Sequence, residues 1–111
     1  MPVINAQNHH EYPEFPFHAF GVHFYAPDQY PTKCHYHDCD EWWIVLSGKA
    51  RVMSEGKEYI VTTGDILWTR MGDEHHLLEI LEMPYGIAYL EEQLRGQKRP
   101  GHLHREDEEP K

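Results

Sequence analysis

The chain has 111 residues and a formal net charge of -9, and 40% of its residues are hydrophobic. This length predicts one domain with its own core and no room for a second catalytic domain. The acidity argues against nucleic acid as a partner, because nucleic-acid-binding domains usually carry a basic face. No apolar stretch approaches the roughly 20 residues of a membrane span, and the N-terminus lacks the pattern of a signal peptide. We therefore expect a cytoplasmic protein with no membrane partner.

Short segments of alternating hydrophobic and polar residues recur along the chain, separated by turn residues. They predict strands at residues 17–25, 33–37, 41–46, 49–53, 57–61, 66–69, 76–81 and 85–89. Only residues 91–96 could form a helical turn. Because no helices alternate with the strands, we expect an all-β fold, a small antiparallel barrel or jelly roll. Residues 105–111 form a charged tail for which we expect no fixed structure.

The chain contains two cysteines and ten histidines. Cys34 and Cys39 are five positions apart, a spacing that matches neither a redox pair nor a zinc knuckle, so we expect two free thiols. Four of the histidines lie in polar terminal segments and are expected at the surface: His9, His10, His102 and His104. The inner histidines are therefore the ones that call for a chemical explanation.

The segment HYHDCDE at residues 35–41 places two histidines and a glutamate directly before the apolar run WWIVL. Residues two apart on a strand point to the same side, so His35 and His37 share a face, and Glu41 opens the next strand. Buried imidazoles and carboxylates are costly unless something binds them. His75 follows a glycine turn and offers a fourth donor. These residue types predict a metal site.

Two segments resemble the conserved motifs of the cupin superfamily. The first, at 35–48, reads His35-x-His37-x3-Glu41-x6-Gly48, and the second, at 64–79, reads Gly64-x5-Arg70-x-Gly72-x2-His75. Fifteen residues separate them, the short spacing typical of small single-domain microbial cupins. The chain departs from the family pattern at three positions, none of them a ligand: Gln29 for a glycine, Arg70 for a proline and Glu79 for an asparagine.

The resemblance covers roughly residues 29–79 and implies a cupin domain of jelly-roll type, which we place at residues 1–104. It also implies one divalent metal ion held by His35, His37, Glu41 and His75. Three imidazoles and one carboxylate suit Fe, Mn, Ni, Co or Zn, and the sequence does not choose among them. An octahedral ion would keep two positions open for water, oxygen or a substrate.

Two functions follow from such a site. We favour a small mononuclear metalloenzyme acting on a small polar, oxygen-containing substrate, with dioxygenase, isomerase and lyase chemistry unresolved. The alternative is a non-catalytic module in which the metal helps to hold a small ligand. No catalytic residue beyond the metal ligands is identified.

Seven further residues are candidates for lining the cavity beside the ion: Tyr25, Trp43, Val45, Arg51, Met53, Trp68 and Tyr85. Strand alternation gives Trp43 the same face as Glu41, whereas Trp42 and His76 point outward. An inward Arg51 could bind a substrate carboxylate in a bidentate pair, but alternation leaves its side undecided. The tyrosines are candidate proton donors.

Several residues near the motifs have two interpretations. His18 and His23 lie on the first predicted strand and either reach the mouth of the cavity or occupy the surface. Cys39 is either a small buried turn residue or a partner of the metal site. The first strand, within FPFHAFGVHFY, is too apolar for a free edge, so we expect a homodimer with this strand near the interface.

Overall fold

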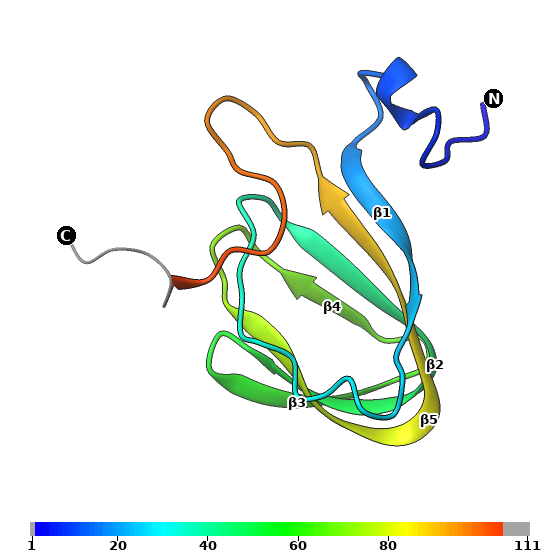
Figure 1. The fold of residues 1–111 in the computed structure, drawn as a ribbon, viewed down its shortest axis with the longest axis vertical. Coiled ribbons are helices and arrows are strands. Elements are labelled where there is room, and N and C mark those ends of the chain that lie inside the picture. The colour runs from blue at the N-terminus through cyan, green and yellow to red at the C-terminus, as the bar shows by residue number, and fades with distance from the viewer. Residues whose placement is uncertain (1, 106–111) are drawn as a thin grey trace.

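The computed structural model describes residues 2–105, and strands dominate it (Figure 1). In chain order the elements are the 3-10 helix η1 (His9–Glu11) and the strands β1 (Phe17–Phe24), β2 (Glu41–Ser54), β3 (Lys57–Thr62), β4 (Ile66–Thr69) and β5 (His75–Glu92). The predicted all-β class is confirmed. No helix in this part of the chain is long and apolar enough to cross a membrane. Apart from Arg105, the predicted charged tail lies outside the described residues.

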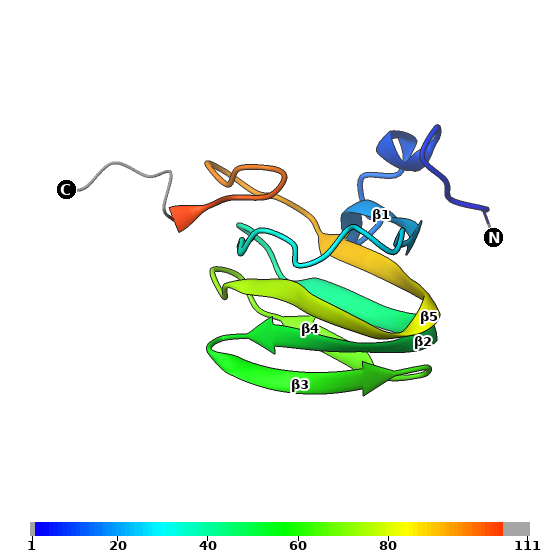
Figure 2. The same ribbon diagram turned by 60° about the horizontal axis from the view of Figure 1, so that its bottom comes forward.

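The strands form one antiparallel sheet in the order β1-β5-β2-β3, and β4 also pairs with β2. Strand β2 pairs with β5 along its whole length, with β4 over its first residues and with β3 over its last. Both long strands bend, and their bends lie side by side at one end of the molecule (Figures 1 and 2). The sheet therefore folds over itself and encloses a core.

The bend in β2 lies at Gly48, whose φ of 82° suits a residue without a side chain. A Cβ there would collide with the backbone carbonyls of Glu82 and Pro84, which lie in the bend of β5. The register with β5 shifts repeatedly between Val45 and Ala50. The sequence predicted two strands here, at 41–46 and 49–53. They form one strand that bends at Gly48.

The bend inverts which residues of β2 face inward. Before it the buried residues are Glu41, Trp43 and Val45, and after it they are Ala50, Val52 and Ser54. Ten side chains make the core: Trp43, Val45, Ala50, Val52, Val61, Leu67, Leu77, Ile80, Tyr85 and Ile87. Burial of each large apolar side chain contributes roughly 1.5–3 kcal/mol.

Four further predicted elements differ from the structure. Residues 33–37 are not a regular strand and make only the isolated bridges His35↔His75 and Tyr36↔Leu103. The predicted strands 76–81 and 85–89 are parts of β5, and the helical turn at 91–96 is wrong because β5 continues to Glu92. There Glu92 pairs with Phe17 of β1, so tertiary pairing decides the conformation. Neither Cys34 nor Cys39 takes part in a disulfide within the described residues, as predicted.

Candidate metal centre

Four buried side chains from three segments meet at one end of the folded sheet. His35 and His37 lie in the loop before β2, Glu41 begins β2, and His75 begins β5. Reciprocal backbone hydrogen bonds join His35 to His75, with N–O distances of 3.1 and 2.8 Å. One donor atom from each of the four side chains lies within 4.8 Å of every other. The structure thus brings together all four ligands that the cupin resemblance implied.

Backbone carbonyls fix the orientation of all three imidazoles. The partners are the carbonyl of Lys33 for Nδ1 of His35 (2.9 Å), that of Gly101 for His37 (3.0 Å) and that of Asp73 for His75 (3.0 Å). Because a carbonyl can only accept, each Nδ1 carries the proton and donates it, which leaves a lone pair on the Nε2 of each ring in its neutral form. The Nε2 atoms of His35 and His37 are buried, and within the described residues neither makes a hydrogen bond of good geometry.

These lone pairs converge on a carboxylate. Oε1 of Glu41 lies 3.1 Å from Nε2 of His37 and 3.2 Å from Nε2 of His75. Two lone pairs this close to an anionic oxygen repel it unless a proton or a cation lies among them. A divalent ion satisfies all four donors at once, and histidine ligands whose other nitrogen donates to a carbonyl are the usual arrangement around metals. The residues therefore fit a metal ion.

Burial and charge set the protonation of the site. Burial lowers the pKa of His35 to about 3, and the nearby His75 acts in the same direction. Burial alone would raise the pKa of the Glu41 carboxyl, but its contacts with His37 and His75 hold that pKa well below its usual range. A neutral imidazole and an ionised carboxylate are the forms that bind metal.

A cavity of about 660 Å³ adjoins the four ligands, and His35 and Glu41 form part of its wall. Two of the predicted lining residues, Tyr25 and Trp43, form part of the cavity wall. His23 also lines it, which agrees with the first of its two interpretations. Burial and the charge of Glu41 raise the pKa of Tyr25 to about 12, so its phenol stays protonated. The site is therefore accessible from one side.

The C-terminal segment after β5 passes over this cavity and adds a histidine that sequence analysis had left at the surface. The ring of His102 is exposed, yet its centroid lies 4.3 Å from that of His35 and 5.2 Å from that of His37. Paired backbone hydrogen bonds between Tyr36 and Leu103 hold the segment in place. No local pattern near residue 102 signals this contact, because it depends on a segment more than sixty positions away.

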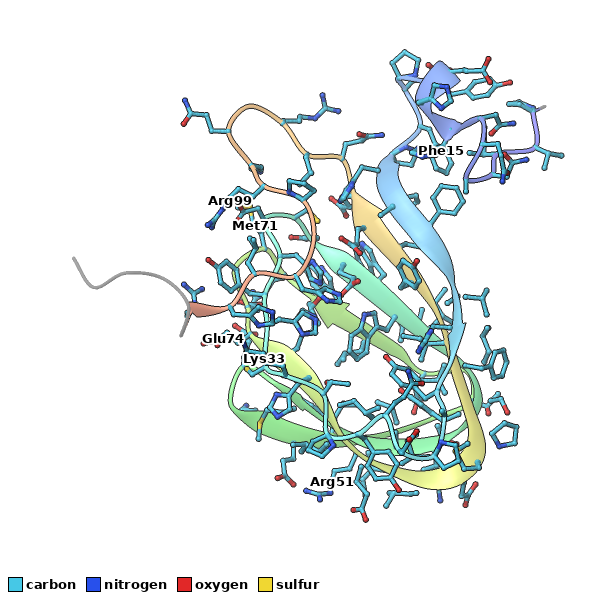
Figure 3. The ribbon with its side chains drawn as sticks, in the orientation of Figure 1. Phe15, Lys33, Arg51, Met71, Glu74 and Arg99 are labelled. Atoms are coloured by element: carbon cyan, nitrogen blue, oxygen red, sulfur yellow. The ribbon has the colours of Figure 1, made fainter. Side chains whose placement is uncertain are left out.

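Three predicted cavity residues lie elsewhere. Arg51 points away from the cavity (Figure 3) and forms ion pairs of 3.2 Å with both Glu58 and Glu79. Met53 shares this outward face because the bend inverts the alternation of β2. Trp68 is 51% exposed and stacks on Trp42, with ring centroids 5.2 Å apart. These three predictions are wrong.

Two further predicted cavity residues belong to the core. Val45 and Tyr85 are buried and pack with the apolar side chains beneath the cavity, whose wall does not include them. Tyr85 packs near Tyr25 of the cavity wall, with ring centroids 5.5 Å apart. Burial raises the pKa of the Tyr85 hydroxyl far above its usual range. Both residues support the site from below.

Sequence analysis missed Glu91, which it placed in a helical turn. Glu91 lies opposite Glu41 on the neighbouring strand, and its Oε1 is 3.4 Å from Nδ1 of His37. Burial, together with the negative charge of Glu41, raises the pKa of Glu91 to about 7. Only the pairing of β5 with β2 brings these two carboxyl groups together, so no local signal could have found Glu91.

A folded antiparallel sheet with a buried three-histidine, one-glutamate group beside a cavity defines a small β-barrel protein equipped to hold a metal. Residues 21–80, just over half of the chain, match the family model of the cupin domain. The chain belongs to the cupin family.

Among known sequences, an 81-residue stretch is 40% identical to "Uncharacterized protein y4oW" of Sinorhizobium fredii (strain NBRC 101917 / NGR234). The match covers 69% of this chain but only 37% of that protein. This chain therefore corresponds to a little over a third of the length of that relative.

Three solved structures share the fold. A predicted oxalate decarboxylase from Thermotoga maritima has a TM-score of 0.64 at 18% identity, covering 83% of this chain and 76% of that one. A cupin-2 domain containing protein from Shewanella frigidimarina has a TM-score of 0.55 at 21% identity, covering 67% and 69%. The structure titled FeII HppE has a TM-score of 0.53 at 18% identity, covering 63% and 40%. At these identities the likeness is one of fold.

Proposed function

We propose that this cupin binds one divalent transition-metal ion through His35, His37, Glu41 and His75 and is a metalloenzyme for a small polar, oxygen-containing substrate. The observation that carries the proposal is the convergence of Nε2 lone pairs on a carboxylate, with every Nδ1 occupied by a backbone carbonyl. A bound ion of this kind supplies Lewis-acid or redox chemistry at its open positions.

The chain's own residues would bind and orient the substrate in the adjoining cavity. Trp43 and Ile87 give that wall an apolar part, whereas Gln29, Thr32 and Lys33 give it a polar one. Tyr25 keeps its proton and can donate a hydrogen bond to a ligand oxygen. His102 lies over the ligands and can limit the access of water. This mixture favours a small, polar molecule.

Two of the three solved structures support a metalloenzyme without deciding the reaction. One is described as a predicted oxalate decarboxylase, and the other is the protein FeII HppE. The non-catalytic binding module stays the alternative, because His102, whose ring lies beside those of His35 and His37, is an exposed residue. The cytoplasmic location and the homodimer stay predictions.

The ligand set is tested by metal analysis of untagged protein. The wild type should carry an ion that the His75→Ala variant loses, because one of four donors is gone. The matched control is His76→Ala, the next residue along β5, which is absent from the ligand group and should keep its metal. Unchanged metal in His75→Ala, or in the double variant His35→Ala/His37→Ala, would contradict the proposal.

The activity is tested separately with the metal-loaded protein. Oxygen uptake and turnover are measured on keto acids, small dicarboxylic acids and sugars. Iron with substrate-dependent oxygen uptake indicates a dioxygenase, and turnover without oxygen indicates an isomerase or lyase. Zinc with ligand binding but no turnover favours the binding module.

A further inference from the structure

A second group of metal-binding side chains lies beside the first. It consists of His18 on β1, Cys39 in the loop before β2, and Glu91 near the end of β5. One donor atom from each lies within 4.8 Å of the others. Nε2 of His18 is 3.5 Å from Oε1 of Glu91 and 3.8 Å from Sγ of Cys39. Three different kinds of ligand from three segments therefore meet at one point.

A β-bulge contributes to this meeting. Phe17 pairs with Glu92 and Ala19 pairs with Glu91, so the register shifts across His18, which has no partner residue of its own. A bulged residue leaves the regular alternation, and its side chain is redirected. Here it comes next to Glu91 on the adjoining strand. The irregularity in β1 is explained if His18 serves a local site.

The burial of this group favours a cation. Cys39 is 5% exposed and Glu91 is 7% exposed, and Glu91 lies beside the buried carboxylate of Glu41. Two carboxyl groups that share a buried region are costly unless positive charge accompanies them. One ion at the four-ligand site serves Glu41, whereas Glu91 contacts the imidazoles of His18 and His37 and the carboxylate of Glu41 itself. A second ion would compensate the second carboxylate.

This group can be reached from two cavities, because Glu91 lies in the wall of the main cavity and a second cavity adjoins His18. A smaller cavity of about 280 Å³ has His18 in its wall. Its other lining residues are His9, His10, Tyr12, Pro13 and Gln93. An ion can therefore approach His18 from the side of the N-terminal segment, where two further histidines are available to capture it.

We propose that His18, Cys39 and Glu91 bind a second divalent ion of the zinc type. A thiolate, an imidazole and a carboxylate are all common zinc ligands, and three of them leave one position for water. Binding replaces the thiol proton of Cys39 with a metal–sulfur bond and releases that proton to water, with no change in oxidation state. Glu91 also contacts His37, which belongs to the four-ligand group. A second ion bound by Glu91 would therefore lie near the first.

Cobalt(II) titration of the metal-free full chain tests this proposal directly. A thiolate bound to cobalt gives a charge-transfer band in the near ultraviolet, and the four-ligand site, which offers only nitrogen and oxygen, gives none. We expect the wild type to bind two equivalents and to show the band. Cys39→Ser should lose the band and one equivalent while it keeps the other. Cys34→Ser is the matched control, because it removes the chain's other thiol, and should retain both.

Two further variants separate this proposal from the function proposed above. His35→Ala should lose the first ion but keep the charge-transfer band, so failure of one site does not imply failure of the other. His18→Gln lies on a half-buried position and should weaken the band if Cys39→Ser does not fold. The proposal is overturned if saturating cobalt gives no band in the wild type, or if the band persists in Cys39→Ser.

Discussion

The two halves of β2 have the same alternating sequence pattern but opposite relations to the interior. In the first half, Glu41 and Trp43 face inward to the metal group and its cavity. In the second half, Arg51 and Met53 also have odd numbers, so unbroken alternation would turn them inward, yet they face outward. Alternation along a strand therefore predicts which side chains face inward only as far as the next bulge or bend.

The inversion has a local cause and a functional consequence. The register shifts around Gly48 change the phase, and the adjoining bend of β5 does the same on the neighbouring strand. Glu41 of the first half belongs to the metal group, whereas Arg51 of the second half forms surface ion pairs.

The largest expected effect comes from Gly48→Ala, which acts on the bend itself. The new Cβ would lie 2.9 Å from Cα of Tyr85 and would collide with two carbonyls of β5. With the cost of a left-handed backbone added, we expect a loss of more than about 3 kcal/mol in the free energy of unfolding. Urea unfolding of the metal-free protein measures it.

Gly56→Ala is the matched control for this prediction. Gly56 has a φ of 77°, close to that of Gly48, but a Cβ there would meet no atom within 4 Å. It should lose only about 1–2 kcal/mol, the cost of the backbone conformation alone. Equal losses in the two variants would show that close packing at the bend is unimportant.

A smaller effect is expected from Glu41→Gln, in the first half of β2. The amide keeps the shape of the side chain but removes the anionic oxygen on which the imidazoles converge. We expect the metal affinity to fall by at least about 100-fold, because a change in a ligand should cost no less than the roughly 10–100-fold that follows a change in a residue behind a ligand. Competition with a coloured chelator measures this affinity.

Glu79→Gln provides the comparison in the other half of the sheet. Glu79 pairs with Arg51 on the outer face, so its amide should leave metal affinity unchanged. A similar loss of affinity in both variants would mean that the charge of the whole protein, rather than the position of Glu41, governs metal binding.

The sequence predicts this architecture best where the signal is local. Strands β1, β3 and β4 have nearly the predicted bounds, because turn residues and alternation mark them. The ligand set came from two motifs whose spacing is visible without knowledge of the fold. By contrast, β2 was predicted as two strands, because a glycine is equally compatible with a turn between two strands and with a bend inside one.

The residues that sequence analysis missed depend on contacts between distant segments. Glu91 meets Glu41 through the pairing of β5 with β2, and His102 meets His35 through a bridge from the C-terminal segment. The misplaced residues have the same origin. Arg51 and Met53 were ambiguous in phase, and only the register shift around Gly48 decides their side. Trp68 was misplaced because its partner on the outer face, Trp42, became known only from the pairing of β4 with β2.

The smallest effect is expected from Arg51→Gln, and it tests the inversion most directly. Arg51 is among the cations nearest to the motifs in sequence, so it is an obvious candidate to bind a substrate carboxylate. Its ion pairs with Glu58 and Glu79 lie at the surface, where solvent and salt screen them, so stability should change little. Metal affinity and ligand binding, measured by titration calorimetry, should equal those of the wild type. A clear loss of ligand binding would place Arg51 at the cavity and would mean that the second half of β2 keeps the phase of the first.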